Sequence, residues 1–346
     1  FLGHPLINDV TSILNYPEIS VESMENTNGG IVLSLSDQIF PGEILELKFL
    51  NANRGRQDTL QTSISIEQLN RFSPSLADRY GYRVFDDLDI SYSLAPEYDW
   101  LEIDHIPGSH LPIYDAYEED DERTVIELPF PVTYYGQTFD QMTVCSNGWL
   151  SLGVSPEVSF YNQVIPSPSG PNAMIAPFWD DLITSSGNVS YAALEDMFIV
   201  EWSEVSNLHV ESELTFQVII YNAVSHPTAT GDNQIKMQFK DHHDYDTFAN
   251  FSTTGIESPD YSTGVQVSFN NIQDPSIGSM GSSRALLFTT DRGERLPPAQ
   301  ISMDQQNLNF LLNPWVLASD SIAISNTGGS PLVFQVEPAD ESMREP

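Results

Sequence analysis

The chain has 346 residues, 40% of them hydrophobic and 11% aromatic, which is enough apolar material for two or three folded domains and excludes a disordered segment. Its 49 acidic and 13 basic residues give a formal net charge of -36, which repels nucleic-acid phosphates and anionic membranes. The single cysteine excludes an internal disulfide framework, and no apolar run of about 18 residues predicts a membrane span.

Residues 1–75 are the first predicted domain. Strand-like stretches lie on both sides of the Pro41–Gly42 turn, in GGIVLSLSDQIFPGEILELKFLN, and again in LQTSISIEQL. Runs rich in β-branched and aromatic residues, separated by turn residues, are typical of hairpins. We predict a small Ig-like sandwich with a leading linker.

The central block, residues 80–293, carries the strongest strand signals. Apolar and polar residues alternate in FIVEW (198–202), TFQVIIYN (215–222), QIKMQFK (234–240) and GVQVSFN (264–270). Each pattern predicts a half-buried strand with one apolar face inward. Turn clusters such as SNG and TGDN separate the strands at spacings of roughly 8–15 residues, which favours an antiparallel sandwich or barrel. Helical periodicity is scarce, so the predicted fold class is all-β.

A break at RGERLPPAQ precedes the third block, residues 299–346. It contains strand-like segments and the sequence SNTGGSPL, but only about 48 residues, whereas an Ig-type sandwich needs about 100. We therefore predict the first half of a C-terminal Ig-like domain.

Seven ordered segments between residues 80 and 292 carry a family resemblance. They are YGYRVFDDLDISYSLAPEYDWLEID, IELPFPVTYYGQTFDQMTVCSNGWLSLG, MIAPFWDDL, FIVEWSEV, TFQVIIYN, TTGIESPD and RALLFTTD. In this order they resemble a β-sandwich module, jelly-roll or nidogen-like, of secreted multidomain bacterial proteins, often found downstream of gingipain-like cysteine peptidase domains. The resemblance implies an extracellular module without catalysis, flanked by Ig-like domains, in a parent protein that includes a peptidase.

The lone thiol, Cys145 in TVCSNGWLSLG, is the obvious candidate nucleophile. A cysteine nucleophile needs a lowered pKa and access to substrate. Cys145 instead lies in a β run before the turn at Asn147 and Gly148, and no signature of the CGSCW kind surrounds it. No G-x-S-x-G elbow is present either. We predict a structural strand thiol, no catalytic residues and no enzymatic activity for this chain.

Acidic side chains beside apolar strands are candidate calcium ligands. Asp180 and Asp181 follow a strand in PFWDDL, and Asp86, Asp87 and Asp89 lie in FDDLD. Calcium takes six to eight oxygen ligands from flexible loops, so calcium is the candidate cofactor. The alternative for Asp180 and Asp181 is capping of a loop through local backbone amides.

Aromatic side chains offer a second kind of binding site. Tyr134, Tyr135, Trp149 and Tyr161 are the candidates for an exposed platform on which a sugar ring stacks, whereas Trp202 alternates inward and belongs to the core.

Three functions remain open at this level. The first is an accessory, spacer or adhesive module of a secreted or cell-surface bacterial protein, whose partners are the neighbouring domains and an extracellular glycan or protein. The second is a calcium-dependent carbohydrate- or protein-binding module, and the third is a hydrolase of unrecognised type. A binding module needs a pocket with convergent polar groups, and an enzyme needs a base within hydrogen-bond reach of a nucleophile.

Overall fold

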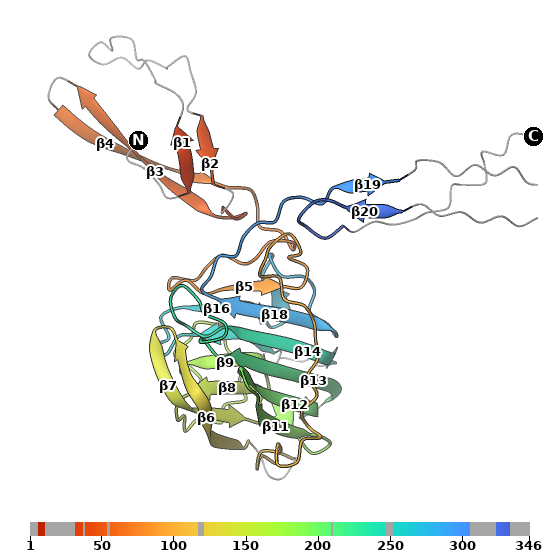
Figure 1. The fold of residues 1–346 in the computed structure, drawn as a ribbon. Helices are drawn as coiled ribbons and strands as arrows, with labels where there is room; N and C mark the ends of the chain where they lie inside the picture. The colour runs from red at the N-terminus through yellow and green to blue at the C-terminus, as the bar shows by residue number, and fades with distance from the viewer. Residues whose placement is uncertain are drawn as a thin grey trace, which may run out of the picture.

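The computed structural model describes residues 6–10, 32–36, 39–53, 56–116, 121–208, 210–245, 252–304 and 323–332. In these residues the chain forms twenty β-strands and no helix, and every strand pair is antiparallel (Figure 1). The prediction of an all-β antiparallel fold is confirmed.

The first large sheet has the strand order β10-β12-β13-β14-β18-β5, with β11 also paired to β12. Its members are β5 (Arg83–Asp86), β10 (Leu182–Ile183), β11 (Asn188–Ala193), β12 (Met197–Asn207), β13 (Val210–Tyr221), β14 (Ile235–His243) and β18 (Arg284–Thr289). Three of the strands predicted from alternation are therefore its central strands, β12, β13 and β14.

The second large sheet has the order β17-β16-β15-β9-β8-β7-β6. Its members are β6 (Arg123–Tyr134), β7 (Gln137–Cys145), β8 (Trp149–Leu152), β9 (Met174–Trp179), β15 (Thr253–Glu257), β16 (Gly264–Phe269) and β17 (Ile272–Gln273). The fourth predicted strand, GVQVSFN, is β16.

The main core lies between the inner faces of these two sheets. Alternate residues of each strand face it, such as Phe216, Val218 and Ile220 of β13, and Met142 and Val144 of β7, all without solvent exposure. Burial of each such side chain contributes about 1.5–3 kcal/mol. The period-2 pattern of the sequence thus produces the sandwich.

The outer faces of the sheets are also covered, which corrects the expectation of half-buried strands. Leu101, Ile103 and Ile106 of an irregular segment pack on Ile199 of β12 and Ile219 of β13. The strands β12 and β13 are therefore buried on both faces. Irregular covering segments have no periodicity, so alternation alone does not reveal them.

The edge strands are protected against pairing with other chains. Strand β6 contains Pro129 and Pro131, and its ladder with β7 is interrupted between Glu127 and Val132. Proline removes a ladder donor and is tolerated at an edge. At an edge of the first sheet, the Leu111 amide donates to the carbonyl of Val189 in β11. Both devices discourage edge-to-edge association.

Small two-stranded sheets flank the sandwich. They pair β1 (Ile7–Val10) with β2 (Leu33–Leu35), β3 (Ile44–Asn53) with β4 (Arg56–Ser65), and β19 (Ile301–Met303) with β20 (Ile324–Asn326). Figure 1 shows both flanking parts at the end of the sandwich where β5 lies. The Ig-like character of these parts stays a prediction, and most of residues 299–346 lie outside the described residues.

Candidate functional site

Cys145 lies on the outer face of β7 and has no solvent exposure. Its side chain belongs to a small apolar cluster with Ile165, Met174 and the indoles of Trp149 and Trp179. Burial raises the pKa of the thiol to about 12. A protonated, inaccessible thiol is not a nucleophile, and the prediction of a structural strand thiol is confirmed.

The segment around this thiol is a strand, a turn and a second strand, as the Asn-Gly dipeptide predicts. The turn joins β7 to β8, and Gly148 has a φ of +67°. The Asn147 side chain accepts from the Leu182 amide at 2.9 Å and donates to the Val158 carbonyl at 3.1 Å. The turn therefore anchors two other segments rather than exposing the cysteine.

Trp149 is not part of an exposed platform, contrary to the sequence prediction. Its indole and that of Trp179 both donate to the carbonyl of Ser159, each at 2.9 Å, and both rings are fully buried. The irregular segment that contains Ser159 covers this face of the second sheet. A covering segment from another part of the chain thus converts an outward-facing tryptophan into a core residue.

The three tyrosines of the predicted platform have different environments. Tyr134 is fully buried, and its hydroxyl donates to the Met174 and Glu257 carbonyls, so it is not exposed either. Tyr135 is 7% exposed and Tyr161 is 60% exposed. A shared exposed platform therefore does not form, because tertiary packing buries three of its four rings. Ligand binding by Tyr135 or Tyr161 stays a prediction.

Asp180 and Asp181 lie after β9. Asp180 is 1% exposed; one carboxylate oxygen accepts from the Asp181 amide at 2.8 Å and the other from the Asn207 side chain at 2.6 Å. The backbone carbonyl of Asp181 accepts from the Leu208 amide. These bonds are of the loop-capping kind that we weighed against calcium binding.

The acids of FDDLD gather around an arginine from a distant strand. Arg284 of β18 contacts Asp86 at 2.9 Å and Asp87 at 2.6 Å. Burial raises the pKa of Asp89 to about 8, so this carboxyl holds a proton at neutral pH. The guanidinium is thus the positive charge that lies beside two of these acids in the structure.

No group of three or more His, Cys, Asp or Glu side chains in the described part of the chain is arranged to hold a metal ion. The two groups of candidate acids come from different places in the fold: Asp86, Asp87 and Asp89 lie at the end of β5 and just after it, and Asp180 and Asp181 follow β9. Calcium binding at the predicted residues stays a prediction.

A buried charged junction connects the N-terminal part to the sandwich, and no sequence motif indicates it. The Phe40 ring is fully buried between two guanidinium groups, those of Arg83 at 4.5 Å and Arg292 at 4.9 Å from its centroid. Glu43 accepts from Arg292 at 2.7 Å and from the Phe40 amide at 3.2 Å, and lies 3.8 Å from Arg83. Burial is the main cause that lowers the pKa of Arg83, to about 10.

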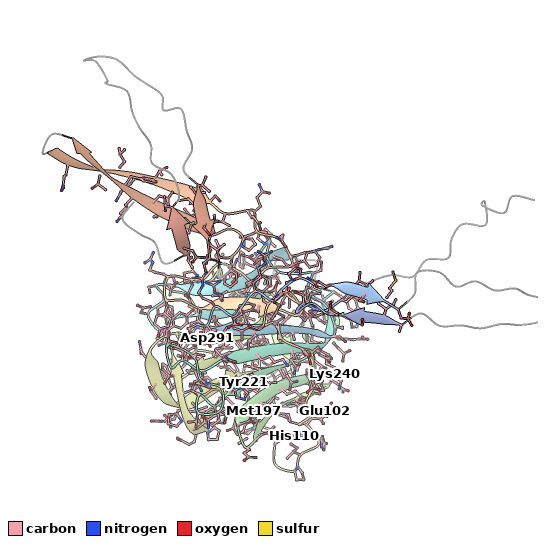
Figure 2. The ribbon with its side chains drawn as sticks, turned by 45° about the horizontal axis from the view of Figure 1, so that its top comes forward. Glu102, His110, Met197, Tyr221, Lys240 and Asp291 are labelled. Atoms are coloured by element: carbon pink, nitrogen blue, oxygen red, sulfur yellow. The ribbon has the colours of Figure 1, made fainter. Side chains whose placement is uncertain are left out.

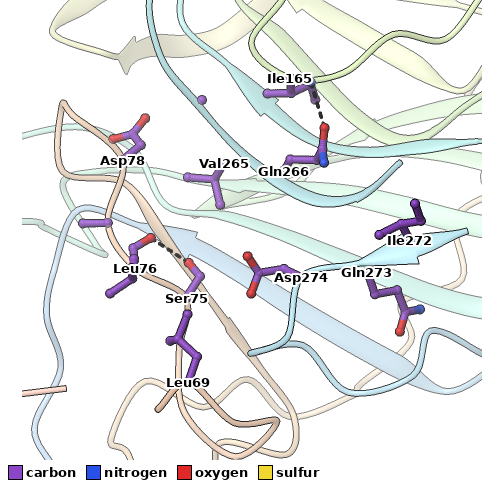
Figure 3. A pocket seen from close by; sticks show the side chains of 12 residues that line it. Leu69, Ser75, Leu76, Asp78, Ile165, Val265, Gln266, Ile272, Gln273 and Asp274 are labelled. Carbon is purple, nitrogen blue, oxygen red and sulfur yellow. Dashed lines mark hydrogen bonds between the residues drawn. The ribbon is translucent and has the colours of Figure 1, made fainter. Parts of the chain in front are cut away.

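A pocket of about 340 Å³ lies between segment 69–78 and strands β16 and β17 of the second sheet (Figure 3). Leu69, Val265 and Ile272 provide apolar walls, and Asp274 faces the opening between them. No pattern in the sequence indicates this pocket, because its walls come together only in the folded chain.

A second pocket of about 230 Å³ adjoins the first. Arg79 and Thr263 line it. Arg79 directly follows Asp78 and Thr263 directly precedes Gly264, and both Asp78 and Gly264 line the first pocket. The Arg79 amide donates to the Thr263 hydroxyl at 3.1 Å, which links the two rims. Tyr135, one of the predicted ligand-binding residues, lines this second pocket.

A buried acidic group lies on the covered outer face of the first sheet. Glu201 of β12 has no solvent exposure, and burial together with the neighbouring Glu102 carboxyl raises the pKa of Glu201 to about 8. Lys240 lies 2.8 Å from Glu102, and Figure 2 shows these two side chains at the same edge of the sheet. Glu201 therefore carries a proton at neutral pH.

The fold and these sites define a β-sandwich module whose single thiol is structural. A family model for NIDO-related domains matches residues 103–293, more than half of the chain, and the chain belongs to this family. The match agrees with the nidogen-like form of the predicted fold. No curated protein and no solved structure matches the chain. None of the described residues forms a helix of the length and hydropathy that crossing a membrane requires.

Proposed function

We propose that the chain is a non-catalytic accessory module of a secreted or cell-surface bacterial protein, which spaces neighbouring domains and presents a binding face. The junction around Glu43 is the observation that carries the proposal. Its buried ring and paired charges support a fixed orientation between the N-terminal part and the sandwich. Membership of the NIDO-related family supports the non-catalytic role.

Scattering tests the spacer role. The small-angle X-ray scattering of the wild-type chain should fit a model in which the described N-terminal part and the sandwich keep one fixed relative orientation. Phe40→Ala removes the ring between the two guanidinium groups and should broaden the distance distribution. Leu60→Ala, at an apolar position of β4 that is 55% exposed, is the matched control and should leave the distribution unchanged. Identical curves for all three proteins would contradict a junction-based spacer.

The parent protein is part of the same proposal. The sequence resemblance suggests a gingipain-like peptidase, or another surface-delivered hydrolase, as the catalytic partner. Reading the open frame on both sides of this chain tests it: a signal peptide and peptidase upstream and an anchoring tail downstream are expected. A frame without any such domain would contradict the accessory role.

The two adjoining pockets favour a second candidate, a calcium-dependent carbohydrate- or protein-binding module. Its calcium dependence has a direct test in the melting temperature with calcium or with a chelator. A rise with calcium that Asp180→Asn abolishes supports the predicted site at Asp180 and Asp181. Equal melting temperatures would remove calcium from the proposal.

A further inference from the structure

The second pocket combines an aromatic wall with a polar rim. Its lining residues are Arg79, Tyr80, Tyr135, Gln137, Ser258, Pro259, Asp260, Ser262 and Thr263. Pockets for drug-sized ligands measure roughly 300–1,000 Å³, so a volume of about 230 Å³ fits one small ring better than a large ligand.

The aromatic wall is held rigid by two aspartates. The Tyr80 hydroxyl donates to Asp232 at 2.8 Å, and the Tyr135 hydroxyl donates to Asp78 at 2.7 Å. Asp78 in turn accepts from the backbone amides of Tyr80, Gly81 and Tyr82, and Asp232 accepts from the amide of Gly136. Rings fixed before binding lose little conformational entropy when a ligand arrives.

The turn that carries this wall departs from the usual hairpin sequence. Tyr135 and Gly136 join β6 to β7, with φ values of +49° and +72°. A two-residue turn with both φ values positive favours Asn-Gly, and a side chain other than Asn or Asp costs about 1–2 kcal/mol there. Backbone strain of this kind is concentrated at functional sites.

Gly136 also allows the second ring to approach the turn. A Cβ atom at Gly136 would lie 3.1 Å from the Tyr80 hydroxyl oxygen. Tyr80 remains 39% exposed and so offers its ring to solvent, whereas Tyr135 behind it is 7% exposed. The two ring centroids are 5.1 Å apart.

The opposite rim supplies an ionised carboxylate. One oxygen of Asp260 accepts from the hydroxyls of Ser258 at 2.8 Å and Ser262 at 2.7 Å, and from the Ser262 amide at 3.1 Å. These bonds lower the pKa of Asp260. Its other oxygen accepts no hydrogen bond from another described residue, so it remains available to a ligand.

Two further planar polar groups, a guanidinium and a side-chain amide, line the pocket beside the Asp260 carboxylate. Arg79 and Gln137 are exposed, and neither side chain makes a salt bridge or hydrogen bond to any described residue. With Asp260 they offer a guanidinium, an amide and a carboxylate at one small opening. Such groups donate to and accept from adjacent hydroxyls of the same ligand.

These observations select a chemical class. A ring with an apolar C–H face and several hydroxyls satisfies both the Tyr80 ring and the planar polar groups, whereas an apolar ligand leaves those groups unpaired. A phosphate-rich ligand is repelled by the net charge of -36. We propose, building on the proposed role as a module that presents a binding face, that this pocket binds one pyranose unit of a carbohydrate.

A titration monitored by amide NMR shifts tests the proposal. The probes are methyl glycosides of glucose, galactose, mannose and N-acetylglucosamine, followed by short oligosaccharides of any sugar that binds. At least one glycoside should shift the amides of Tyr80, Gly136 and Ser262 specifically. Tighter binding of the oligosaccharide would identify a polymer as the natural source, and equal binding would identify the free sugar.

Variants place the binding in the pocket. Tyr80→Ala should weaken binding at least tenfold, and Tyr80→Phe, which keeps the ring, should weaken it less. Asp260→Asn changes the opposite rim with little effect on folding and should also weaken binding. Tyr114→Ala, at a 55% exposed tyrosine outside the pocket, is the matched control and should bind like the wild type.

The proposal fails if no glycoside or oligosaccharide shifts these amides, or if Tyr114→Ala reduces binding as much as Tyr80→Ala. The spacer role has its own readout in scattering. Failure of sugar binding with unchanged scattering would therefore reject the pocket and leave the spacer role in place.

Discussion

Substitution Glu43→Gln should destabilise the protein by about 3 kcal/mol. Arg83 is only 3% exposed, and its Nε and Nη1 atoms have no hydrogen-bond partner among the described residues, so Glu43 is its nearest opposite charge, at 3.8 Å. Removing one partner of a buried ion pair costs about 3–5 kcal/mol. Because Arg292 is 37% exposed and water solvates part of its charge, the lower end of this range applies. The glutamine still accepts from the Phe40 amide.

Urea unfolding of four proteins measures this effect: the wild type, Glu43→Gln, Arg83→Met and the double variant. Removing Arg83 as well removes the unpaired buried charge, so the double variant should lose at least about 1 kcal/mol less than the sum of the single losses. Glu46→Gln changes an exposed acid of β3 and should stay within about 0.5 kcal/mol of the wild type. A loss below about 0.5 kcal/mol for Glu43→Gln, or strict additivity, would refute the argument.

Three further predictions concern the interior. Gly148→Ala places a Cβ atom 1.8 Å from the Phe178 carbonyl oxygen at a φ of +67°, so we expect a loss of at least about 3 kcal/mol in urea unfolding; a smaller loss would show that the turn relaxes. Cys145 should react with a thiol reagent at pH 8 only after unfolding, since its pKa is about 12 and it is buried; fast labelling of the folded protein would contradict its structural role. Glu201, with a pKa raised to about 8, stabilises the fold fully below its unfolded pKa of about 4.3, and this contribution is lost as pH rises through 8. Glu201→Gln should therefore gain melting temperature relative to the wild type from pH 5 to pH 9, and a constant difference would contradict this.

Local pattern was sufficient for the strands that form the sandwich. Residues 198–202 lie in β12 and residues 215–221 in β13, and Trp202 and Phe216 belong to the main core as the alternation predicts. The same pattern wrongly predicted that the outer face of these strands is exposed to solvent. Ile199 and Ile219 lie under a segment about a hundred residues earlier in the chain, and no local signal predicts such a contact.

Candidate sites were harder to predict because their partners are distant in sequence. The acids at 86 and 87 meet Arg284, which lies 198 and 197 residues further along the chain. From the sequence alone these acids predict a calcium site, which stays a prediction; in the structure an arginine of the same chain lies beside them. The exposure of Trp149 was predicted wrongly because the segment that covers it, at Ser159, is irregular and has no pattern in the sequence.

The position of the sugar pocket follows from this covering of both sheets. Chain segments lie over the outer faces of the first and second sheets, at Ile103 and at Ser159, and the inner faces form the core. In the described residues, the strand surfaces beneath these two segments are thus unavailable to ligands. Of the four tyrosines and tryptophans predicted to bind, the one in a turn, Tyr135, lines a pocket. In a fully covered sandwich, binding chemistry is therefore expected where the backbone leaves the sheet, and strained turns with unusual residues are the places to look for it.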